Sequence, residues 1–258
     1  MKVVLFAGGM GTRISEETDI RPKPMVEIGG KPILWHIMKI YSHFGFNEFI
    51  VCLGYKGYVI KEYFMHYFMH NSDITVDLQH NSVEIHNTQS ESFKVTLVET
   101  GLNTKTAGRL QQVEKYLGDE TFMLTYGDGV ADVDLHELLR FHQHHGKIAT
   151  VTAVQLEARF GGMELDDAGQ VTAFREKAKD EGKWVNAGFF VLDASVFRYL
   201  KADMGQVMWE DDPLEQLTRD NELVAYRHRG FWKCMDALRD KLELEELWKN
   251  RQAKWKLW

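Results

Sequence analysis

Glycines, one arginine and one lysine near the start of the chain form its clearest chemical pattern. Residues 7–13 read Ala-Gly-Gly-Met-Gly-Thr-Arg, and residues 21–25 read Arg-Pro-Lys-Pro-Met. Backbone N–H groups in a glycine turn form a concave nest for phosphate oxygens, and the Arg13 guanidinium adds a planar fork of donors. Lys23 is a cation whose backbone is restricted by a proline on each side. This combination suits a polyanion, most simply a nucleoside triphosphate.

Two common glycine motifs do not fit this loop. A dinucleotide fingerprint starting at Gly9 would need a glycine where Ile14 stands, and a P-loop would need Gly-Lys-Ser/Thr after the turn. A plain strand–turn connection with no ligand is the simplest alternative for Gly-Gly-x-Gly alone. Because Arg13 and Lys23 follow so closely, we favour a functional loop.

A buried strand is expected to present the loop. Residues 2–6 are apolar and partly β-branched, which is typical of a central parallel strand. A helix from Pro32 to about residue 44, a strand at 48–53 and a helix at 57–70 follow. This alternation predicts a parallel sheet flanked by helices, and such sheets bind ligands at the carboxyl ends of their strands.

The later segments continue this alternation without an internal repeat or linker, so we expect one α/β domain. The predicted strands cover residues 74–78, 83–85, 93–98, 122–126, 148–154, 163–166, 170–176, 184–192 and 222–227. The predicted helices cover residues 110–117, 134–145, 194–200, 212–219 and 236–249.

Several polar residues lie where this arrangement could use them. Asp128 follows a predicted strand between two glycines, where a carboxylate could hold Mg²⁺, although an Asp-Gly turn explains it equally well. Asp236 precedes the last helix, where an N-cap is a credible role. The residues alone favour a solvated side chain for Arg109. For Asn186, binding of sugar hydroxyls and a role within a strand are equally supported.

Longer stretches of the chain resemble a known family. Gly-Gly-x-Gly-Thr-Arg at residues 8–13, followed by Lys-Pro at 23–24, resembles the sugar-phosphate nucleotidylyltransferases. Residues 22–36 make the chain most similar to the glucose-1-phosphate cytidylyltransferases of that family. The segments 54–58, 126–131 and 231–236 extend the resemblance nearly end to end.

The resemblance implies a fold and an activity. The fold would be α/β, Rossmann-like and mixed, with a mainly parallel central sheet and a small β-rich sugar-binding part, as in nucleotide-diphospho-sugar transferases. The implied enzyme transfers a cytidylyl group from CTP to α-D-glucose 1-phosphate in the presence of Mg²⁺, for dideoxysugar and lipopolysaccharide O-antigen synthesis. We also expect a homo-oligomer. The expected parts are nucleotide-binding (about 1–130), sugar-phosphate-binding (about 131–235) and a C-terminal helix (236–258).

The resemblance also assigns roles to individual residues. The implied nucleotide contacts are Phe6, Ala7, Gly8, Gly9, Gly11, Thr12, Arg13, Lys23, Thr104, Gly108, Arg109 and Asp128. The implied sugar-phosphate contacts are Glu176, Lys177, Asn186 and Gly188, and the implied metal ligands are Asp128 and Asp236. Lys23, Arg13 and Lys177 would be catalytic. The family's Glu-Lys-Pro reads Glu-Lys-Ala here, because residue 178 is Ala, and this loses a proline that would stiffen the loop.

Three other functions stay open at this point. The same chemistry could use dTTP, UTP or a different sugar phosphate, because base choice rests on a few hydrogen bonds. A non-catalytic, nucleotide-sensing relative is possible, although the intact charged residues argue against it. A nicotinamide dehydrogenase is disfavoured by the missing third glycine.

Composition excludes some other classes. The net charge of −7 argues against a nucleic-acid binder with a basic face. No apolar run reaches the roughly 18–20 residues of a membrane span, and the chain begins directly with a strand, so we expect a cytoplasmic protein without a membrane partner.

Cys52 and Cys234 are expected to be reduced in that compartment. His142, His144 and His145 are expected on a solvated helix face rather than on a metal.

Overall fold

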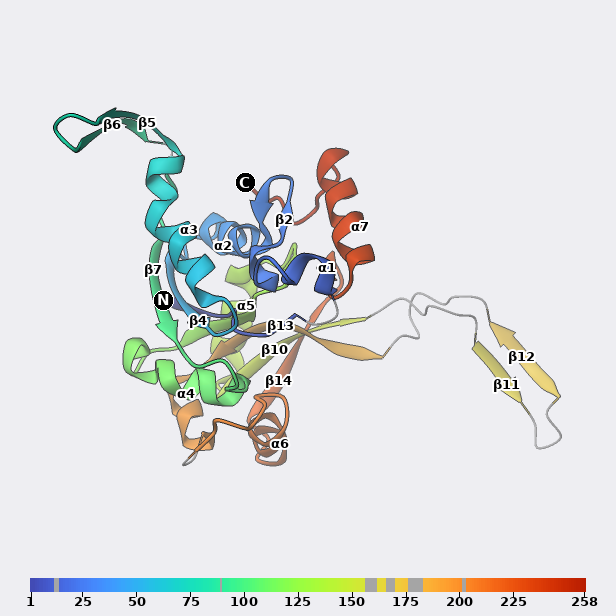
Figure 1. The fold of residues 1–258 in the computed structure, drawn as a ribbon. Coiled ribbons are helices and arrows are strands. Elements are labelled where there is room, and N and C mark those ends of the chain that lie inside the picture. The colour runs from blue at the N-terminus through green and yellow to red at the C-terminus, as the bar shows by residue number, and fades with distance from the viewer. Residues whose placement is uncertain (12–13, 89, 156–161, 166–169, 176–182, 201–202) are drawn as a thin grey trace.

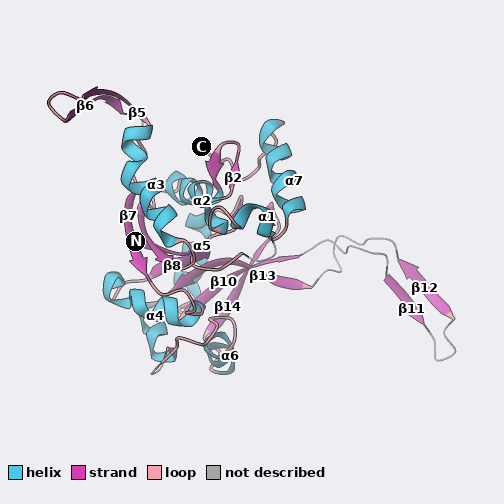
Figure 2. Cartoon of the chain, in the orientation of Figure 1, coloured by secondary structure: helices cyan, strands magenta, loops and turns pink. Residues whose placement is uncertain are grey.

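The computed structural model describes residues 1–11, 14–88, 90–155, 162–165, 170–175, 183–200 and 203–258. Figure 1 shows a central sheet with helices on both sides, and Figure 2 separates the two kinds of element by colour.

In the described part of the chain, the main sheet contains seven strands. Their order is β14 (Leu223–His228), β10 (Ala149–Gln155), β13 (Trp184–Leu192), β8 (Phe122–Tyr126), β1 (Lys2–Phe6), β4 (Glu48–Leu53) and β7 (Lys94–Glu99). β13 runs antiparallel to both of its neighbours, and the other pairs are parallel. The mixed, mainly parallel sheet confirms the predicted fold class.

Alternating side chains on the central strands pack into two separate hydrophobic cores, one on each face of the sheet. On β1, Val3 and Leu5 join one buried cluster, whereas Val4 and Phe6 join the other. Helices α2 (Ile33–His43), α3 (Gly57–His70), α5 (Leu135–His145) and α7 (Leu238–Lys249) contribute to the first cluster. Helices α4 (Thr106–Leu117) and α6 (Asp212–Arg219) and the 3₁₀ segment η3 (Ala194–Tyr199) contribute to the second. The central strands are therefore covered on both faces, which explains their continuous apolar sequences.

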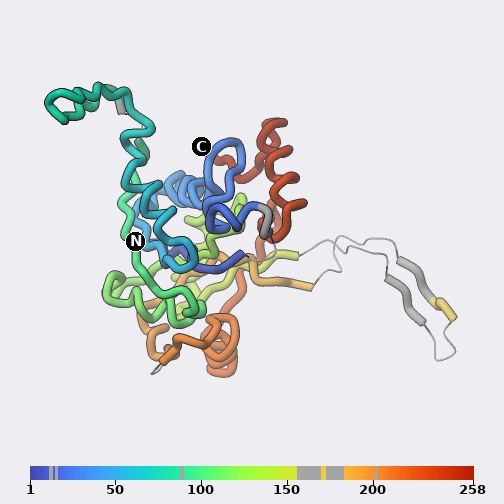
Figure 3. The backbone as a smooth tube through the Cα atoms, in the orientation of Figure 1, coloured from blue at the N-terminus to red at the C-terminus, as the bar shows by residue number. Residues whose placement is uncertain are grey.

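Several short helices and two-stranded sheets lie outside the main sheet. The 3₁₀ turn η2 (Lys23–Met25) and helix α1 (Ser15–Thr18) follow the glycine loop. Among the described residues, four two-stranded sheets pair β2 (Glu27–Ile28) with β3 (Lys31–Pro32), β9 (Gly129–Ala131) with β15 (Trp232–Cys234), β5 (Ser72–Asp77) with β6 (Ser82–Thr88), and β11 (Gly162–Leu165) with β12 (Val171–Arg175). The β5–β6 hairpin extends from the end of α3, away from the central sheet (Figure 3).

The start of α4 and the surroundings of His142 differ from the sequence predictions. Helix α4 begins at Thr106, four residues before the predicted start. His142 is buried rather than solvated. Its ring and that of His145 lie within hydrogen-bonding distance of the Thr150 hydroxyl, at 2.9 and 2.7 Å. Burial, followed by the neighbouring His145, lowers the pKa of His142 to about 4.

The cysteines and the C-terminal tail complete the description of the fold. Cys52 and Cys234 are free thiols. Trp255 in the C-terminal tail is buried against Phe231 and Trp248. Within the described ranges, no helix has both the length and the apolar character needed to cross a membrane.

Candidate active site

A cavity of about 930 Å³ opens at the carboxyl ends of β1 and β8. Its volume is in the range of sites that hold a nucleotide-sized ligand. The lining residues come from the glycine loop, η2, the segment before α4, the end of β8 and the segment before α6. They include the predicted nucleotide contacts Phe6, Ala7, Gly8, Gly9, Gly11, Lys23, Thr104, Arg109 and Asp128, together with Asp236.

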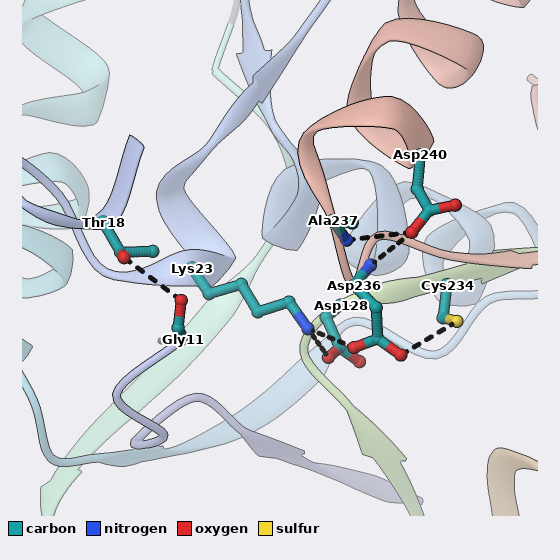
Figure 4. A network of polar contacts seen from close by, with 8 residues as sticks. All are labelled: Gly11, Thr18, Lys23, Asp128, Cys234, Asp236, Ala237 and Asp240. Carbon is teal, nitrogen blue, oxygen red and sulfur yellow. Dashed lines mark hydrogen bonds and ion pairs between the residues drawn. The ribbon is translucent and has the colours of Figure 1, made fainter. Parts of the chain in front are cut away.

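Lys23 joins the two predicted metal ligands. Its Nζ lies 2.6 Å from Asp128 Oδ2 and 2.8 Å from Asp236 Oδ1, and Figure 4 shows both carboxylates meeting at this ammonium group. Burial lowers the pKa of Lys23, but attraction and hydrogen bonds to the two aspartates outweigh it, so the pKa lies above its ordinary value. Lys23 is therefore a cation at neutral pH.

The β9–β15 ribbon explains why residues 108 positions apart meet here. Gly129 pairs with Cys234 across the ribbon, and the Met235 N–H donates to the Asp128 carbonyl at 2.8 Å. This pairing brings Asp128 and Asp236 to the same end of the ribbon. Helix α7 has Ala237 rather than Asp236 as its N-cap, so the Asp236 carboxylate is not used as a helix cap.

The Asp240 side chain holds the backbone next to Asp236. Its Oδ2 accepts the N–H groups of Asp236 and Ala237 at 3.1 and 2.9 Å (Figure 4). The Cys234 thiol donates to Asp236 Oδ2 at 3.6 Å. These contacts fix the backbone and one carboxylate oxygen of Asp236, while the other oxygen faces Lys23.

The aspartate pair fits a hard divalent cation. Two converging carboxylates with substrate phosphates completing the coordination are a usual Mg²⁺ arrangement. Among the described residues, no cluster of three or more His, Cys, Asp or Glu side chains offers a complete protein cage. The donor set therefore suits a metal ion that shares its coordination with a phosphate ligand.

The glycine loop approaches the cavity through its backbone. Gly9 is exposed, and a Cβ added there would meet open space. Gly11 has a φ of +64°, and its carbonyl accepts the Thr18 hydroxyl at 3.1 Å. A Cβ at Gly11 would lie 2.8 Å from Thr18 and 3.0 Å from Lys23, so the loop needs glycine at this position.

Arg109 is buried, which corrects the solvated side chain favoured by the residues alone. Only 3% of it is exposed, and the buried guanidinium donates to backbone carbonyls and one hydroxyl, which offsets the cost of burial. The acceptors are Leu53 O (2.8 Å), Thr100 Oγ1 (2.6 Å), Gly8 O (3.1 Å) and Leu102 O (3.4 Å). Burial lowers the pKa of Arg109, but an arginine stays charged. A cation therefore lies directly beneath the glycine loop.

Two predicted contacts on other elements have clear local roles. Gly108 allows α4 to pack closely, since a Cβ there would lie 2.8 Å from the Met204 carbonyl. Gly188 has a φ of +79°, and its N–H donates to Asn186 Oδ1 at 2.7 Å. The Asn186 Nδ2 donates to the Tyr126 hydroxyl at 3.1 Å, which connects β13 to a residue of the cavity. Thr12, Arg13, Glu176 and Lys177 lie outside the described residues.

Tyr126 and Glu210 are polar residues of the cavity that were not predicted from the sequence. The Tyr126 hydroxyl donates to Glu210 Oε1. Tyr126 could have been suspected from its place at the end of a buried strand, two residues before Asp128. Glu210 lies in a stretch without helical or strand periodicity, and no sequence pattern pointed to it.

The whole chain is similar in sequence to known nucleotidyl transferases. The family model described as nucleotidyl transferase matches residues 2–245. The chain belongs to the nucleotidyl transferase family. It is 53% identical to the Salmonella typhi protein named glucose-1-phosphate cytidylyltransferase, over all of both chains. It is 48% identical to the Bacillus subtilis protein named probable glucose-1-phosphate cytidylyltransferase, again over all of both chains. The predicted resemblance is confirmed.

Solved structures of this nucleotidyl transferase fold are also similar. A putative glucose-1-phosphate thymidylyltransferase from Bacillus anthracis superposes with a TM-score of 0.70 at 17% identity, over 96% of this chain and 94% of the other. A UDP-glucose pyrophosphorylase bound to UDP-glucose gives 0.69 at 16% identity, over 97% and 98%. At these identities the likeness establishes the fold alone.

Proposed function

We propose that this chain transfers the cytidylyl group of CTP to α-D-glucose 1-phosphate, giving CDP-glucose and pyrophosphate. Full-length relatives of 48–53% identity that carry this activity in their names support the substrates. The observation that carries the chemistry is Lys23 held between Asp128 and Asp236 beside a glycine loop. A sugar 1-phosphate needs no general base, because the second pKa of a phosphomonoester is about 6.

Lys23 is the principal catalytic residue in this proposal. Attack on the α-phosphorus brings two anions together, so the reaction needs alignment and charge neutralisation. The Lys23 ammonium can exchange its carboxylate partners for an α-phosphate oxygen. N–H groups of the glycine loop, together with Arg13, would hold the outer phosphates. Arg109 supports that loop from below by holding the Gly8 carbonyl.

Asp128 and Asp236 would hold the metal. Members of the family generally use a divalent metal, and we propose Mg²⁺. When bound, it would supply positive charge that screens the repulsion between the phosphates. The two carboxylates would keep this charge at the phosphate end of the cavity, next to Lys23.

The remaining predicted contacts would hold the sugar phosphate. Asn186 and Gly188 lie on β13, and a hydrogen bond from Asn186 to Tyr126 joins this strand to the cavity. Glu176 and Lys177 would follow the family pattern, with Lys177 on the phosphate. We retain the proposed parts, with residues 1–130 for the nucleotide, 131–235 for the sugar phosphate and 236–258 as the C-terminal helical segment. The cytoplasmic location stays a prediction.

We also propose a homo-oligomer. On the β5–β6 hairpin, Ile74 pairs with Ile85 and Val76 pairs with Val83, and all four side chains are exposed. An isolated two-stranded hairpin is at best marginally stable in water, so a second copy covering this apolar face would stabilise it. Sedimentation velocity tests this: charged substitutions at Val76 and Val83 should lower the mass of the assembly, and an unchanged mass would contradict the role of this face.

Product analysis tests the proposed reaction. Incubation with CTP, glucose 1-phosphate and Mg²⁺ should give equimolar CDP-glucose and pyrophosphate, resolved by phosphorus NMR. Lys23→Ala should lower kcat far more than it raises KM, because the contact is made most strongly in the transition state. A change in KM alone would reject the role given to Lys23.

A further inference from the structure

Glu210 is held at the wall of the cavity by the start of α4. Lys105 N–H donates to the Gly205 carbonyl at 2.9 Å, and Ala107 N–H donates to the Val207 carbonyl at 3.1 Å. The segment that leads to Glu210 is therefore paired with the beginning of α4. The Glu210 carboxylate lines the cavity from this fixed position.

Two hydroxyl groups orient the Glu210 carboxylate. Tyr126 donates to Oε1, and Thr106 donates to Oε2 at 2.8 Å. The Thr106 oxygen in turn accepts the Trp209 N–H at 2.7 Å, and the Tyr126 oxygen accepts Asn186 Nδ2 at 3.1 Å. Each carboxylate oxygen thus has one donor. Since a carboxylate offers about four acceptor positions, capacity remains for further donors.

The charge of Glu210 is unusual for its surroundings. Of the ion pairs in the described part of the chain, none involves Glu210, whereas Asp128 and Asp236 share Lys23. A carboxylate without a cation repels phosphate oxygens. It is favourable in a phosphate-binding cavity only where the ligand presents hydrogen-bond donors. The neutral donors of the proposed substrates are the sugar hydroxyl groups and the exocyclic amine of cytosine, and the hydroxyl groups are the more numerous.

We propose that Glu210 accepts hydrogen bonds from the hydroxyl groups of a bound sugar ring and thereby selects the substrate. This inference rests on the proposed function. Two rings could supply the hydroxyls, namely the hexose of the sugar 1-phosphate and the ribose of the nucleotide. Tyr126 connects Glu210 to Asn186, a proposed sugar contact, and Thr106 connects it to α4, which carries the proposed nucleotide contact Arg109.

A double cycle tests the proposal: one change removes the Glu210 carboxylate by mutation, and the other removes a substrate hydroxyl by use of a deoxy analogue. Wild type and Glu210→Gln are assayed for kcat and KM with glucose 1-phosphate and its 2-, 3-, 4- and 6-deoxy analogues. A second arm uses CTP and its 2′- and 3′-deoxy analogues. In wild type, deleting the bound hydroxyl should lower kcat/KM by about 10- to 100-fold, as expected for a hydrogen bond to a charged group. In Glu210→Gln that penalty should fall to less than about threefold.

Controls separate recognition from folding. Glu215→Gln changes a glutamate on α6 that is paired with exposed Arg219, and it should keep every wild-type penalty. Glu210→Asp keeps the charge but withdraws it by one methylene, and it should also lose the hydroxyl penalty. This second variant keeps the test decisive if Glu210→Gln is unfolded by circular dichroism.

Each outcome has one meaning. A penalty lost only with the deoxyglucose phosphates assigns Glu210 to the hexose, and one lost only with the deoxy nucleotides assigns it to the ribose. If both Glu210 variants slow all substrates equally and keep the wild-type penalties, Glu210 only positions Tyr126 and the inference is wrong. If wild type makes no nucleotide sugar from any pair, the proposed function fails instead.

Discussion

Replacing Lys23 with Met should tighten metal binding in the absence of nucleotide. In the structure the Lys23 ammonium lies between Asp128 and Asp236, where a divalent cation would take the same two carboxylates. A cation that enters the free enzyme must therefore displace the ammonium group. Met keeps much of the side-chain volume and removes this competition.

The size of the effect follows from the two ion pairs. The side chain of Lys23 is 14% exposed, that of Asp128 29% and that of Asp236 42%. Solvent screens such partly exposed pairs, so each contributes roughly 1 kcal/mol or less. The variant should gain about 1–2 kcal/mol in metal binding, which corresponds to roughly 5- to 30-fold tighter affinity. Binding should strengthen even as activity is lost.

Electron paramagnetic resonance of free Mn²⁺ measures this affinity directly, since Mn²⁺ accepts the same oxygen ligands as Mg²⁺. Lys94→Met is the matched control, because Lys94 pairs with Glu48 at 2.9 Å away from the site and its loss changes the net charge equally. Equal or weaker Mn²⁺ binding by Lys23→Met, relative to that control, would refute the shared use of the two carboxylates.

Three further outcomes follow from the structure. Asp236→Asn should weaken Mn²⁺ binding by at least about tenfold in the same resonance assay, and unchanged binding would remove it from the metal site. Gly8→Ala should reduce thermal stability and activity, because its Cβ would lie 2.2 Å from Arg109 Nη1, whereas Gly9→Ala has open space and should keep wild-type thermal stability. Burial lowers the pKa of His36 to about 4, so the unfolded chain, whose His36 titrates near 6.5, takes up the proton first. Urea unfolding should therefore show that the stability from neutral His36 is present above pH 6.5 and falls by about 3 kcal/mol toward pH 4; a flat profile would contradict this.

Local sequence patterns were sufficient for the central elements. β1 and β8 match their predicted bounds because continuous apolar runs that end at a glycine loop allow little else. The glycine loop, Lys23 and Asp128 were predictable for the same reason, since each follows directly from such a strand or its turn. The partnership of Asp128 and Asp236 needed the family resemblance, because the β9–β15 pairing joins segments far apart in sequence.

The surroundings of Arg109 and Glu210 and the placement of β7 depend on tertiary contacts, which the sequence does not reveal. In the sequence, Arg109 looks like any exposed arginine near the start of a helix. In the structure it is buried, and its guanidinium donates to the carbonyls of Leu53, Gly8 and Leu102. Glu210 is oriented by hydrogen bonds from Thr106 on α4 and from Tyr126 on β8. Both residues are far from Glu210 in sequence, so neither contact is visible as a local pattern. β7 and the β5–β6 hairpin have similar alternating sequences, yet β7 joins the main sheet and the hairpin does not.

Pyrophosphate release with Mg²⁺ and glucose 1-phosphate, compared across CTP, UTP, dTTP, ATP and GTP, tests the central claim most directly. We expect release with CTP well above that with the other four nucleotides. Preferential release with another nucleotide would contradict the cytidylyl assignment while keeping the mechanism. Absence of release with all five would contradict the proposed reaction itself.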